Sequence, residues 1–99
     1  MTTLASEIVV NPAVSVAATS TTLTISLADG RSLSIPLDWY PRLAQATASE
    51  RTHWRLTGNG QGIHWPDLEE DIRVEGLLAG RRSQERADSF ARWRAARAK

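Results

Sequence analysis

The sequence has no cysteine among its 99 residues, so neither a disulfide nor a thiolate metal site can hold the chain together. Methionine, tyrosine and phenylalanine each occur only once. No apolar run approaches the roughly 20 residues that a membrane-spanning helix needs, and residues 1–10 lack the features of a secretory signal. These absences predict a cytoplasmic protein without membrane contact, folded by apolar packing alone.

The length of the chain suits one hydrophobic core, because so short a chain buries only ~60–65% of its unfolded surface. Basic residues concentrate beyond Gly80. We therefore expect a single α+β domain over residues 1–80, followed by a basic helical tail over residues 81–99.

Alternating apolar and polar residues predict an antiparallel sheet near the N-terminus. Residues 22–27 and 32–37 carry Leu or Ile at every second position, between Thr, Ser and Pro. The same alternation upstream predicts a third strand over Ala13–Ala18, with Ile8–Val10 as an extension of it. The first sheet should therefore have three strands and one solvent-facing side.

The number of residues in the turn between the second and third of these strands can be inferred, because it decides which residues of the two strands lie opposite each other. A two-residue turn would set the apolar residues of one strand opposite the polar residues of the other, which burial of one face excludes. A three-residue loop, Ala28–Gly30, pairs Ile25 with Leu33 and puts Gly30 at the left-handed position. Pro36 lacks a backbone donor, which favours an edge strand or a strand end.

After the sheet, the spacing of apolar residues changes to that of short helices. Asp38 is a candidate N-cap for a helix whose first turn contains Pro41. Thr47 and Glu50 form a candidate capping box for a second helix, which runs to about Trp54.

Two short strands and another helix are expected next. The strands, Arg55–Thr57 and Gly62–Trp65, flank a glycine-rich run and form a small second hairpin. Val74–Ala79 has the pattern of a short helix that turns Leu77 and Leu78 inward and ends at the following glycine.

The final segment, Ser83–Ala98, is rich in alanine and arginine, which favour helix. Its apolar stripe is thin and contains Ala87, Phe90, Ala91 and Arg94. The patterns together predict an α+β fold: an N-terminal antiparallel three-stranded sheet, then short helices, a small second hairpin and a peripheral C-terminal helix.

The run GIHWPDLEEDI at residues 62–72, followed by VEGLLAG at residues 74–80, resembles the signature of the bacterial family known as domain of unknown function 2442. The likeness covers residues 14–80 and includes shorter matches at Asp29–Arg31, Leu37–Arg42 and Trp54–Leu56. The family usually has aspartate at the position of Glu69, and the basic tail lies outside its shared pattern.

The resemblance implies a small α+β fold and a bacterial or phage origin, but no established activity. Members of the family resemble modules that are sometimes joined to a helix-turn-helix domain. Others are encoded beside another small uncharacterised protein, in a toxin–antitoxin-like arrangement. The resemblance therefore gives an indication about binding partners but does not identify any site residue.

Charge is distributed unevenly along the second half of the chain. Residues 67–75 contain five acidic residues against Arg73 alone, a net charge of −4, whereas residues 81–99 carry +5. Arginine binds carboxylates and phosphates through its planar fork of donors. The tail therefore supplies the candidate partner-binding residues: Arg81, Arg82, Arg86, Arg92, Trp93, Arg94 and Arg97.

Other candidate sites have simpler structural interpretations. The acidic run Asp67–Asp71 lacks the alternating ligands and central glycine of a calcium loop, so we expect Asp67 in a turn and Glu70 or Asp71 at a helix start. His64 with Asp67 or Glu70 as its carboxylate partner would allow acid–base chemistry, but the sequence offers no nucleophile beside them. The run Gly58–Gly62 precedes a strand rather than the helix that a phosphate loop needs.

The tryptophans divide into two groups. Trp39, Trp54 and Trp65 have apolar neighbours and are expected to pack in the core, whereas Trp93 lies between two arginines of the tail. With no catalytic, cofactor or metal signal, we expect a non-enzymatic protein-interaction or regulatory module, with homodimerisation also considered. The alternative is nucleic-acid binding through the arginine-rich tail, which the pI near 8.4 disfavours.

Overall fold

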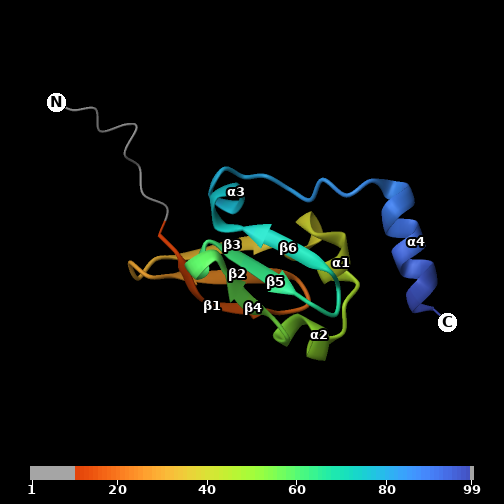
Figure 1. The fold of residues 1–99 in the computed structure, drawn as a ribbon, viewed down its shortest axis with the longest axis horizontal. Helices are drawn as coiled ribbons and strands as arrows, with labels where there is room; N and C mark the ends of the chain where they lie inside the picture. Colours follow the sequence, from red (N-terminus) through yellow and green to blue (C-terminus); the bar gives the residue numbers. More distant parts are fainter. Residues whose placement is uncertain (1–10, 99) are drawn as a thin grey trace.

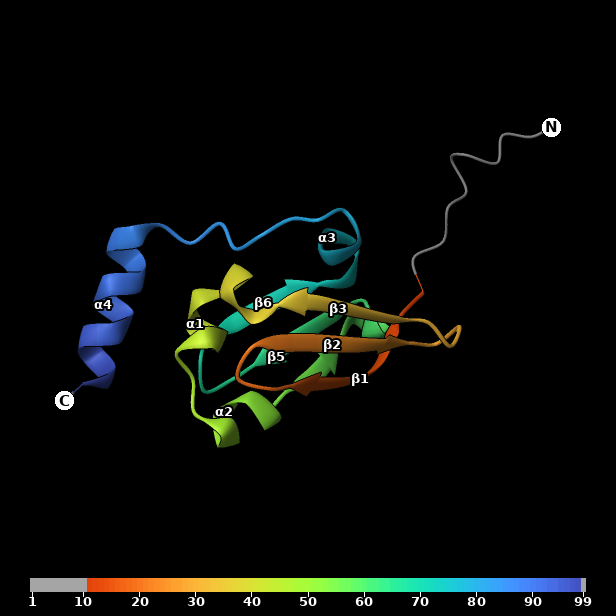
Figure 2. The same cartoon turned by 180° about the vertical axis from the view of Figure 1, so that it is seen from behind.

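The structure is a computed structural model that describes residues 11–98, in which two three-stranded antiparallel sheets pack face to face (Figures 1 and 2). The first sheet contains β1 (Ala13–Ala18), β2 (Thr22–Leu27) and β3 (Ser32–Pro36), and the second contains β4 (Arg55–Thr57), β5 (Gly62–Trp65) and β6 (Glu70–Arg73). The helical segments are η2 (Leu37–Trp39), α1 (Pro41–Ala44), α2 (Ala48–Thr52), η3 (Gly58–Gly60), α3 (Val74–Leu78) and α4 (Ala87–Arg97). The predicted α+β class and the N-terminal sheet are confirmed; the extension at Ile8–Val10 lies outside the described residues.

The hairpin register agrees with the parity argument. Ile25 pairs with Leu33 across β2 and β3, and the N–H of Leu27 donates to the carbonyl of Arg31 at 2.8 Å. The loop between them therefore has three residues, and Gly30 has φ +92°, a conformation that L side chains rarely adopt.

Pro36 lies at the one kind of strand position where its missing donor is harmless. It ends β3, which is an edge strand, and it pairs with Thr22. Hydrogen-bonded pairs alternate along the ladder, and the bond from the N–H of Leu37 to the carbonyl of Thr21 marks the adjacent pair as bonded. The nitrogen of Pro36 therefore points away from β2, and no ladder bond is lost.

The capping predictions had opposite outcomes. Thr47 and Glu50 form the expected capping box, with Thr47 Oγ1 accepting from the N–H of Glu50 at 3.1 Å and Glu50 Oε1 accepting from the N–H of Thr47 at 2.9 Å. The prediction for Asp38 was wrong, because this residue lies within η2 and α1 has Tyr40 at its N-cap without a side-chain cap. Pro41 does begin α1, as expected.

The second sheet has a third strand that the sequence analysis did not predict. The expected strands β4 and β5 have the predicted bounds and Asp67 lies in a turn as expected, but Glu70 and Asp71 belong to β6 and not to a helix start. Ile72 is the one buried residue among its four, and the other three are charged, so the strand has almost no apolar pattern. A four-residue loop joins β5 to β6, and within it Glu69 has φ +52°.

Helix α3 ends as predicted but orients one residue differently. Gly80 has φ +77°, its N–H donates to the carbonyl of Leu77, and the N–H of Arg81 donates to the carbonyl of Gly76. These two bonds form a Schellman motif. Leu77 is buried, but Leu78 is 43% exposed, so the prediction that both leucines turn inward was wrong for Leu78.

The hydrophobic core lies between the two sheets and extends under the short helices. Trp65 is fully buried, and its indole Nε1 donates to the carbonyl of Arg51 at 3.1 Å. Trp39 and Trp54 are partly buried and pack against this core. The expected core role therefore holds fully for Trp65 and partly for the other two.

The C-terminal helix begins later than predicted, at Ala87, and the preceding residues 81–86, here called the strap, have no regular structure. The strap runs from α3 to α4, which lies at the end of the molecule away from β1 (Figure 1). Phe90 is partly buried, but the rest of the expected stripe, Ala87, Ala91 and Arg94, is exposed, so that prediction was wrong. The helix turns Trp93 to the domain instead. Among residues 11–98, no helix combines the length and apolar character required to cross a membrane.

Candidate functional site

The strap is fastened to the domain by an ion pair that is mostly shielded from water. Arg42 Nη2 lies 2.6 Å from Glu85 Oε2, its Nε donates to Glu85 Oε1 at 2.9 Å, and its Nη1 donates to the carbonyl of Leu68 at 2.8 Å. The two side chains are only 15% and 11% exposed. The Arg42 guanidinium lowers the pKa of Glu85, and Ser89 Oγ donates a further hydrogen bond to that carboxylate at 2.9 Å.

A second ion pair fastens the far end of α4 to α2. Arg97 donates to both carboxylate oxygens of Glu50, at 2.7 and 2.9 Å. The same carboxylate closes the capping box of α2, and these bonds, Arg97 first, lower the pKa of Glu50 to about 2. Glu50 thus connects the start of one helix to the end of another.

Trp93 fills the space between the two ion pairs. Its ring stacks on Phe90 with 5.6 Å between centroids, and the guanidinium carbons of Arg42 and Arg97 lie 5.3 and 4.5 Å from its centre. Cation–π contacts of this kind stabilise partly buried sites by ~0.5–2 kcal/mol. Trp93 and Arg97, which were both predicted to bind a partner, therefore hold α4 against the domain.

The strap arginines also contact the domain. The guanidinium of Arg82 lies 4.8 Å from the centre of the Trp39 ring, and the carbonyl of Arg81 accepts from Tyr40 Oη at 2.8 Å. The N–H of Ser83 donates to the carbonyl of Trp39 at 3.0 Å, which holds the strap along η2.

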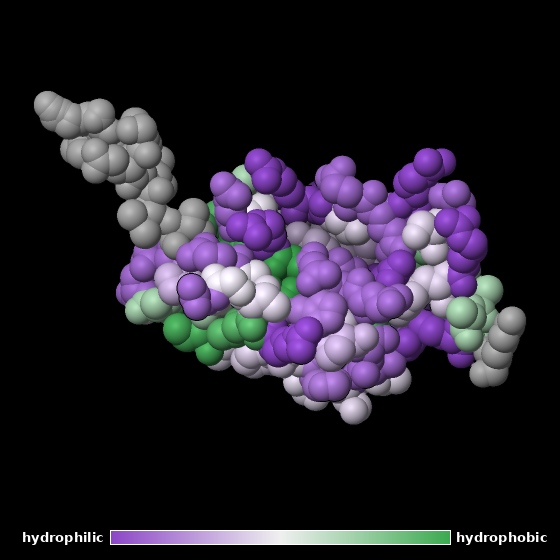
Figure 3. Space-filling model, viewed as in Figure 1, coloured by the Kyte–Doolittle hydropathy of each residue, from purple (hydrophilic) through white to green (hydrophobic). Residues whose placement is uncertain are grey.

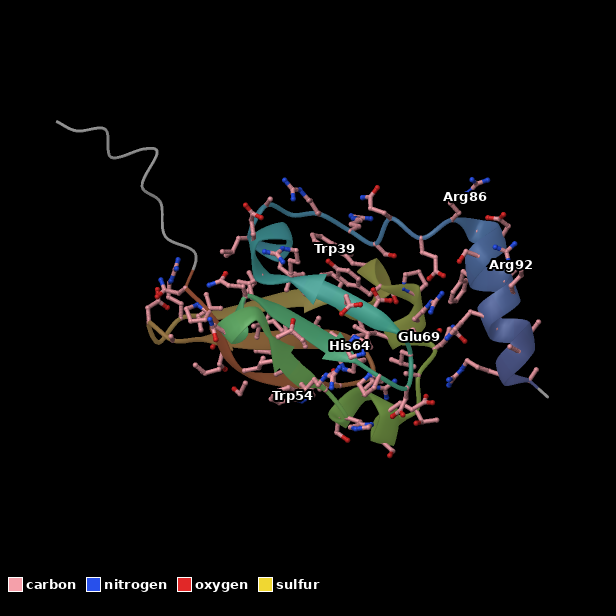
Figure 4. All side chains as sticks on the ribbon, viewed as in Figure 1. Trp39, Trp54, His64, Glu69, Arg86 and Arg92 are labelled. Atoms are coloured by element: carbon pink, nitrogen blue, oxygen red, sulfur yellow. The ribbon has the colours of Figure 1, made fainter. Side chains whose placement is uncertain are left out.

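The remaining candidates form an arginine surface, defined here as Arg86, Arg92 and Arg94. The side chains of Arg86, the N-cap residue of α4, and of Arg92 are 84% and 74% exposed and extend away from the sheets (Figure 4). Asp88 lies 3.4 and 3.6 Å from them, and Arg94 covers the ring of Phe90 at 5.7 Å. The structure thus brings three of the seven arginine-tail candidates to an outward face.

A groove of about 420 Å³ lies between β6 and the strap. Residues 69–73 form one wall of the groove, residues 81–85 form the other, and Tyr40 and Arg42 also line the groove.

The visible face around the groove is predominantly hydrophilic, whereas a hydrophobic patch lies over the start of β1, where Val14 is exposed (Figure 3).

Glu70 is the most perturbed group of the groove. Its pKa is raised to about 7, mainly by burial; the charge of Arg42 lowers this pKa, and the charges of Glu85 and Asp71 raise it. Among residues 11–98, no side chain or backbone N–H donates a hydrogen bond to this carboxylate. The groove therefore contains a carboxylate that changes charge near neutral pH.

We expect the free energy of unfolding to fall as pH rises from about 5 to about 8 because of Glu70. Its folded-state pKa lies above the ordinary value of 4.5, so the folded chain binds more protons than the unfolded chain between these values, and stability decreases with rising pH. The loss should be on the order of 2 kcal/mol. Urea unfolding at several pH values should show it in the wild type.

The variant Glu70→Gln should lack this component, whereas the control Glu75→Gln, at an exposed carboxylate of α3, should keep it. Parallel pH profiles for the wild type and Glu70→Gln would contradict the assignment.

The histidines form two separate pairs with aspartates. His64 Nδ1 lies 2.8 Å from Asp71 Oδ1, its cross-strand neighbour, and His53 Nδ1 lies 2.8 Å from Asp67 Oδ2. The sequence had suggested Asp67 or Glu70 as partner of His64, and the structure pairs it with neither. No group of three His, Asp or Glu side chains within residues 11–98 is arranged to hold a metal ion.

The residues that position the tail and form the groove were not predicted from the sequence. Arg42 and Glu50 carry no local motif for these roles, because their ion-pair partners are 43 and 47 residues away. The pKa of Glu70 is raised mainly by burial, which depends on the position of β6 in the fold. Only the position of Glu50 in the capping box singled it out.

The fold and the groove define a small α+β domain of two facing three-stranded sheets with a basic helix fastened to one end. The chain belongs to the family described as "Protein of unknown function (DUF2442)", whose model matches residues 13–83. The predicted resemblance is confirmed, and α4 lies beyond the match. No curated protein matches the sequence.

Two solved structures are similar. A protein of unknown function from Rhodospirillum rubrum ATCC 11170 has a TM-score of 0.65 and 23% identity, over 76% of this chain and 93% of that chain. The uncharacterized protein CV0863 from Chromobacterium violaceum, solved by NMR, has a TM-score of 0.64 and 29% identity, over 82% of this chain and 74% of that chain. These similarities concern the fold.

Proposed function

We propose that this chain is a non-enzymatic protein-interaction module that binds an acidic protein through the arginine surface of α4. The observation that supports the proposal is that one side of α4 is held against the domain while the other side faces solvent. Trp93 and Arg97 fix one side of the helix to the domain, and Arg86 and Arg92 extend from it into solvent. Contacts on both sides of Trp93 hold the helix in one orientation, which reduces the ordering cost when a partner binds.

The chemistry of this surface favours carboxylates. Guanidinium groups form paired hydrogen bonds with carboxylates, and arginine is enriched among residues that dominate interface energies. Asp88 lies within ion-pair distance of both Arg86 and Arg92 and offsets part of their positive charge. In line with the arrangement that the family resemblance implies, we propose that the partner is a small protein encoded nearby and that the present chain is the regulatory, antitoxin-like member of the pair.

Nucleic-acid binding is the alternative that the same arginines raise. Single-stranded binders need an accessible aromatic face on which a base stacks. The tail has two aromatic residues, Phe90 and Trp93, and their rings stack on each other. Arg42 and Arg97 lie over the ring of Trp93, and Arg94 lies over the ring of Phe90. This arrangement favours a protein partner over a nucleic acid.

The test is affinity capture from a lysate of the source organism, followed by mass spectrometry and reconstitution with the purified candidate. The variant Arg92→Glu/Arg94→Glu should reduce binding of a 1:1 protein complex at least tenfold. The matched control Arg31→Glu/Arg55→Glu makes the same charge change on exposed residues of β-strand and loop regions and should bind normally. Equal binding by both variants would overturn the proposal, as would captured material that nuclease treatment removes.

A further inference from the structure

The edge of β6 that faces the groove carries unpaired backbone groups. The N–H of Val74 donates to the carbonyl of Gln61 at 3.0 Å, so these two opposed residues form a hydrogen-bonded pair. Such pairs alternate along an antiparallel ladder, which makes the pairs at Ile72 and Glu70 bonded as well. The N–H and C=O groups of Asp71 and Arg73 consequently point away from β5 and towards the groove.

These groups have no backbone partner within residues 11–98, because β6 is the outer strand of its sheet. Two N–H and two C=O groups in a row form a template for another strand. The strap lies across the groove from them without pairing, since its own bonds go to Trp39, Tyr40 and Arg42. The volume of about 420 Å³ falls within the ~300–1,000 Å³ typical of ligand clefts.

We propose that this groove binds an extended peptide segment that contains a basic residue, which adds to β6 as a fourth strand of the second sheet. The proposal rests on the proposed interaction function and names a second surface of it, separate from the arginine surface. Strand addition provides affinity through main-chain hydrogen bonds and specificity through alternate side chains.

The charge of the β6 wall favours a basic residue opposite Glu70. Glu69, Glu70 and Asp71 outnumber Arg73 on this wall. Arginines also line the rest of the groove, but Arg42 is paired with Glu85 and Arg82 lies over the ring of Trp39, whereas the carboxylate of Glu70 accepts no hydrogen bond from a described residue. A lysine or arginine opposite Glu70 would supply that donor. Cross-strand neighbours of opposite charge stabilise a pair of strands, and like charges destabilise it.

The same charges argue against a second copy of this chain as the occupant. Pairing of β6 with β6 would place one acidic segment of net charge −4 beside another. The neighbouring edge strand β3 is less suitable as a template, because Pro36 at its end has no N–H to offer on the outward side.

The probe for this proposal is the acetylated and amidated pentapeptide Thr-Val-Thr-Lys-Thr, titrated into the ¹⁵N-labelled full chain. In an antiparallel pairing with its lysine opposite Glu70, its first and third residues exchange backbone bonds with Arg73 and Asp71. We expect the amide resonances of these two residues to shift and their hydrogen exchange to slow. The peptide with glutamate in place of lysine should bind at least tenfold more weakly.

Two matched controls isolate the backbone bonds. N-methylation of the probe's third residue should abolish binding, whereas N-methylation of its second residue, whose N–H faces the strap, should not. On the protein, Asp71→Pro should lose binding relative to Asp71→Ala, because both lack the carboxylate and only proline lacks the N–H.

The variant Arg92→Glu/Arg94→Glu should bind the probe as the wild type does, so failure of the groove and failure of the arginine surface are distinguishable. Shifts confined to residues outside β6 and the strap, equal affinity for the lysine and glutamate peptides, or equal effects of the two N-methylated probes would each overturn the proposal.

Discussion

Replacing Trp65 by alanine is expected to destabilise the protein by ~3–5 kcal/mol. The indole is fully buried between the sheets, and its removal leaves a cavity and an unpaired carbonyl at Arg51. Domains of this size have a total stability of only ~5–15 kcal/mol, so much of the variant should be unfolded at 37 °C. Chemical denaturation followed by circular dichroism gives the measurement.

The control for this variant is Trp54→Ala, which removes the same side chain from a partly exposed position. Its cost should be about 1–2 kcal/mol, since less apolar surface is lost from the core. Equal destabilisation by the two substitutions would contradict the assignment of Trp65 as the central core residue.

Replacing Arg42 by alanine should release α4 from the domain and destabilise the protein by ~2–3 kcal/mol. The guanidinium binds the strap at Glu85, the β5–β6 loop at Leu68 and the ring of Trp93, so one substitution removes three contacts. The released strap exposes the carboxylate of Glu85 to water, so the cost stays below the ~3–5 kcal/mol of a charge left buried without its partner.

Amide hydrogen exchange provides the decisive measurement for Arg42. Exchange in residues 87–97 should accelerate in Arg42→Ala at conditions where the sheets stay protected, and Trp93 should become more accessible to fluorescence quenchers. Arg55→Ala, which removes an exposed arginine of β4, should change neither signal. Unchanged protection of α4 in Arg42→Ala would show that the other contacts suffice to hold it.

The sequence predicted the elements whose signals are local. The β2–β3 register followed from the period-two pattern and from parity, and the α2 capping box followed from Thr47 and Glu50 at the required spacing. Strand β6 was missed because three of its four residues are charged and its burial depends on Ile72 alone. Its strand conformation is imposed by pairing with β5, a tertiary effect that local propensity cannot show.

The candidate site was predicted less completely. The charge of the tail was evident, but its division into anchoring and outward residues depends on where Arg42 and Glu50 lie in space. Leu78 shows the same limit, since a five-residue helix has too few turns to reveal which side faces the core. The groove lies between residues 69–73, where the sequence predicted a helix start at Glu70 or Asp71, and residues 81–85, where it predicted a helical tail.

The fastening of the tail has a consequence for how the protein can be divided. The family match ends at residue 83, yet Arg42 and Glu50 lie inside it and their partners Glu85 and Arg97 lie beyond it. A chain cut at that boundary would present a bare guanidinium, a bare carboxylate and an uncovered side of the domain. Shortening the protein therefore creates a new surface as well as removing one, and single substitutions on α4 separate the two effects.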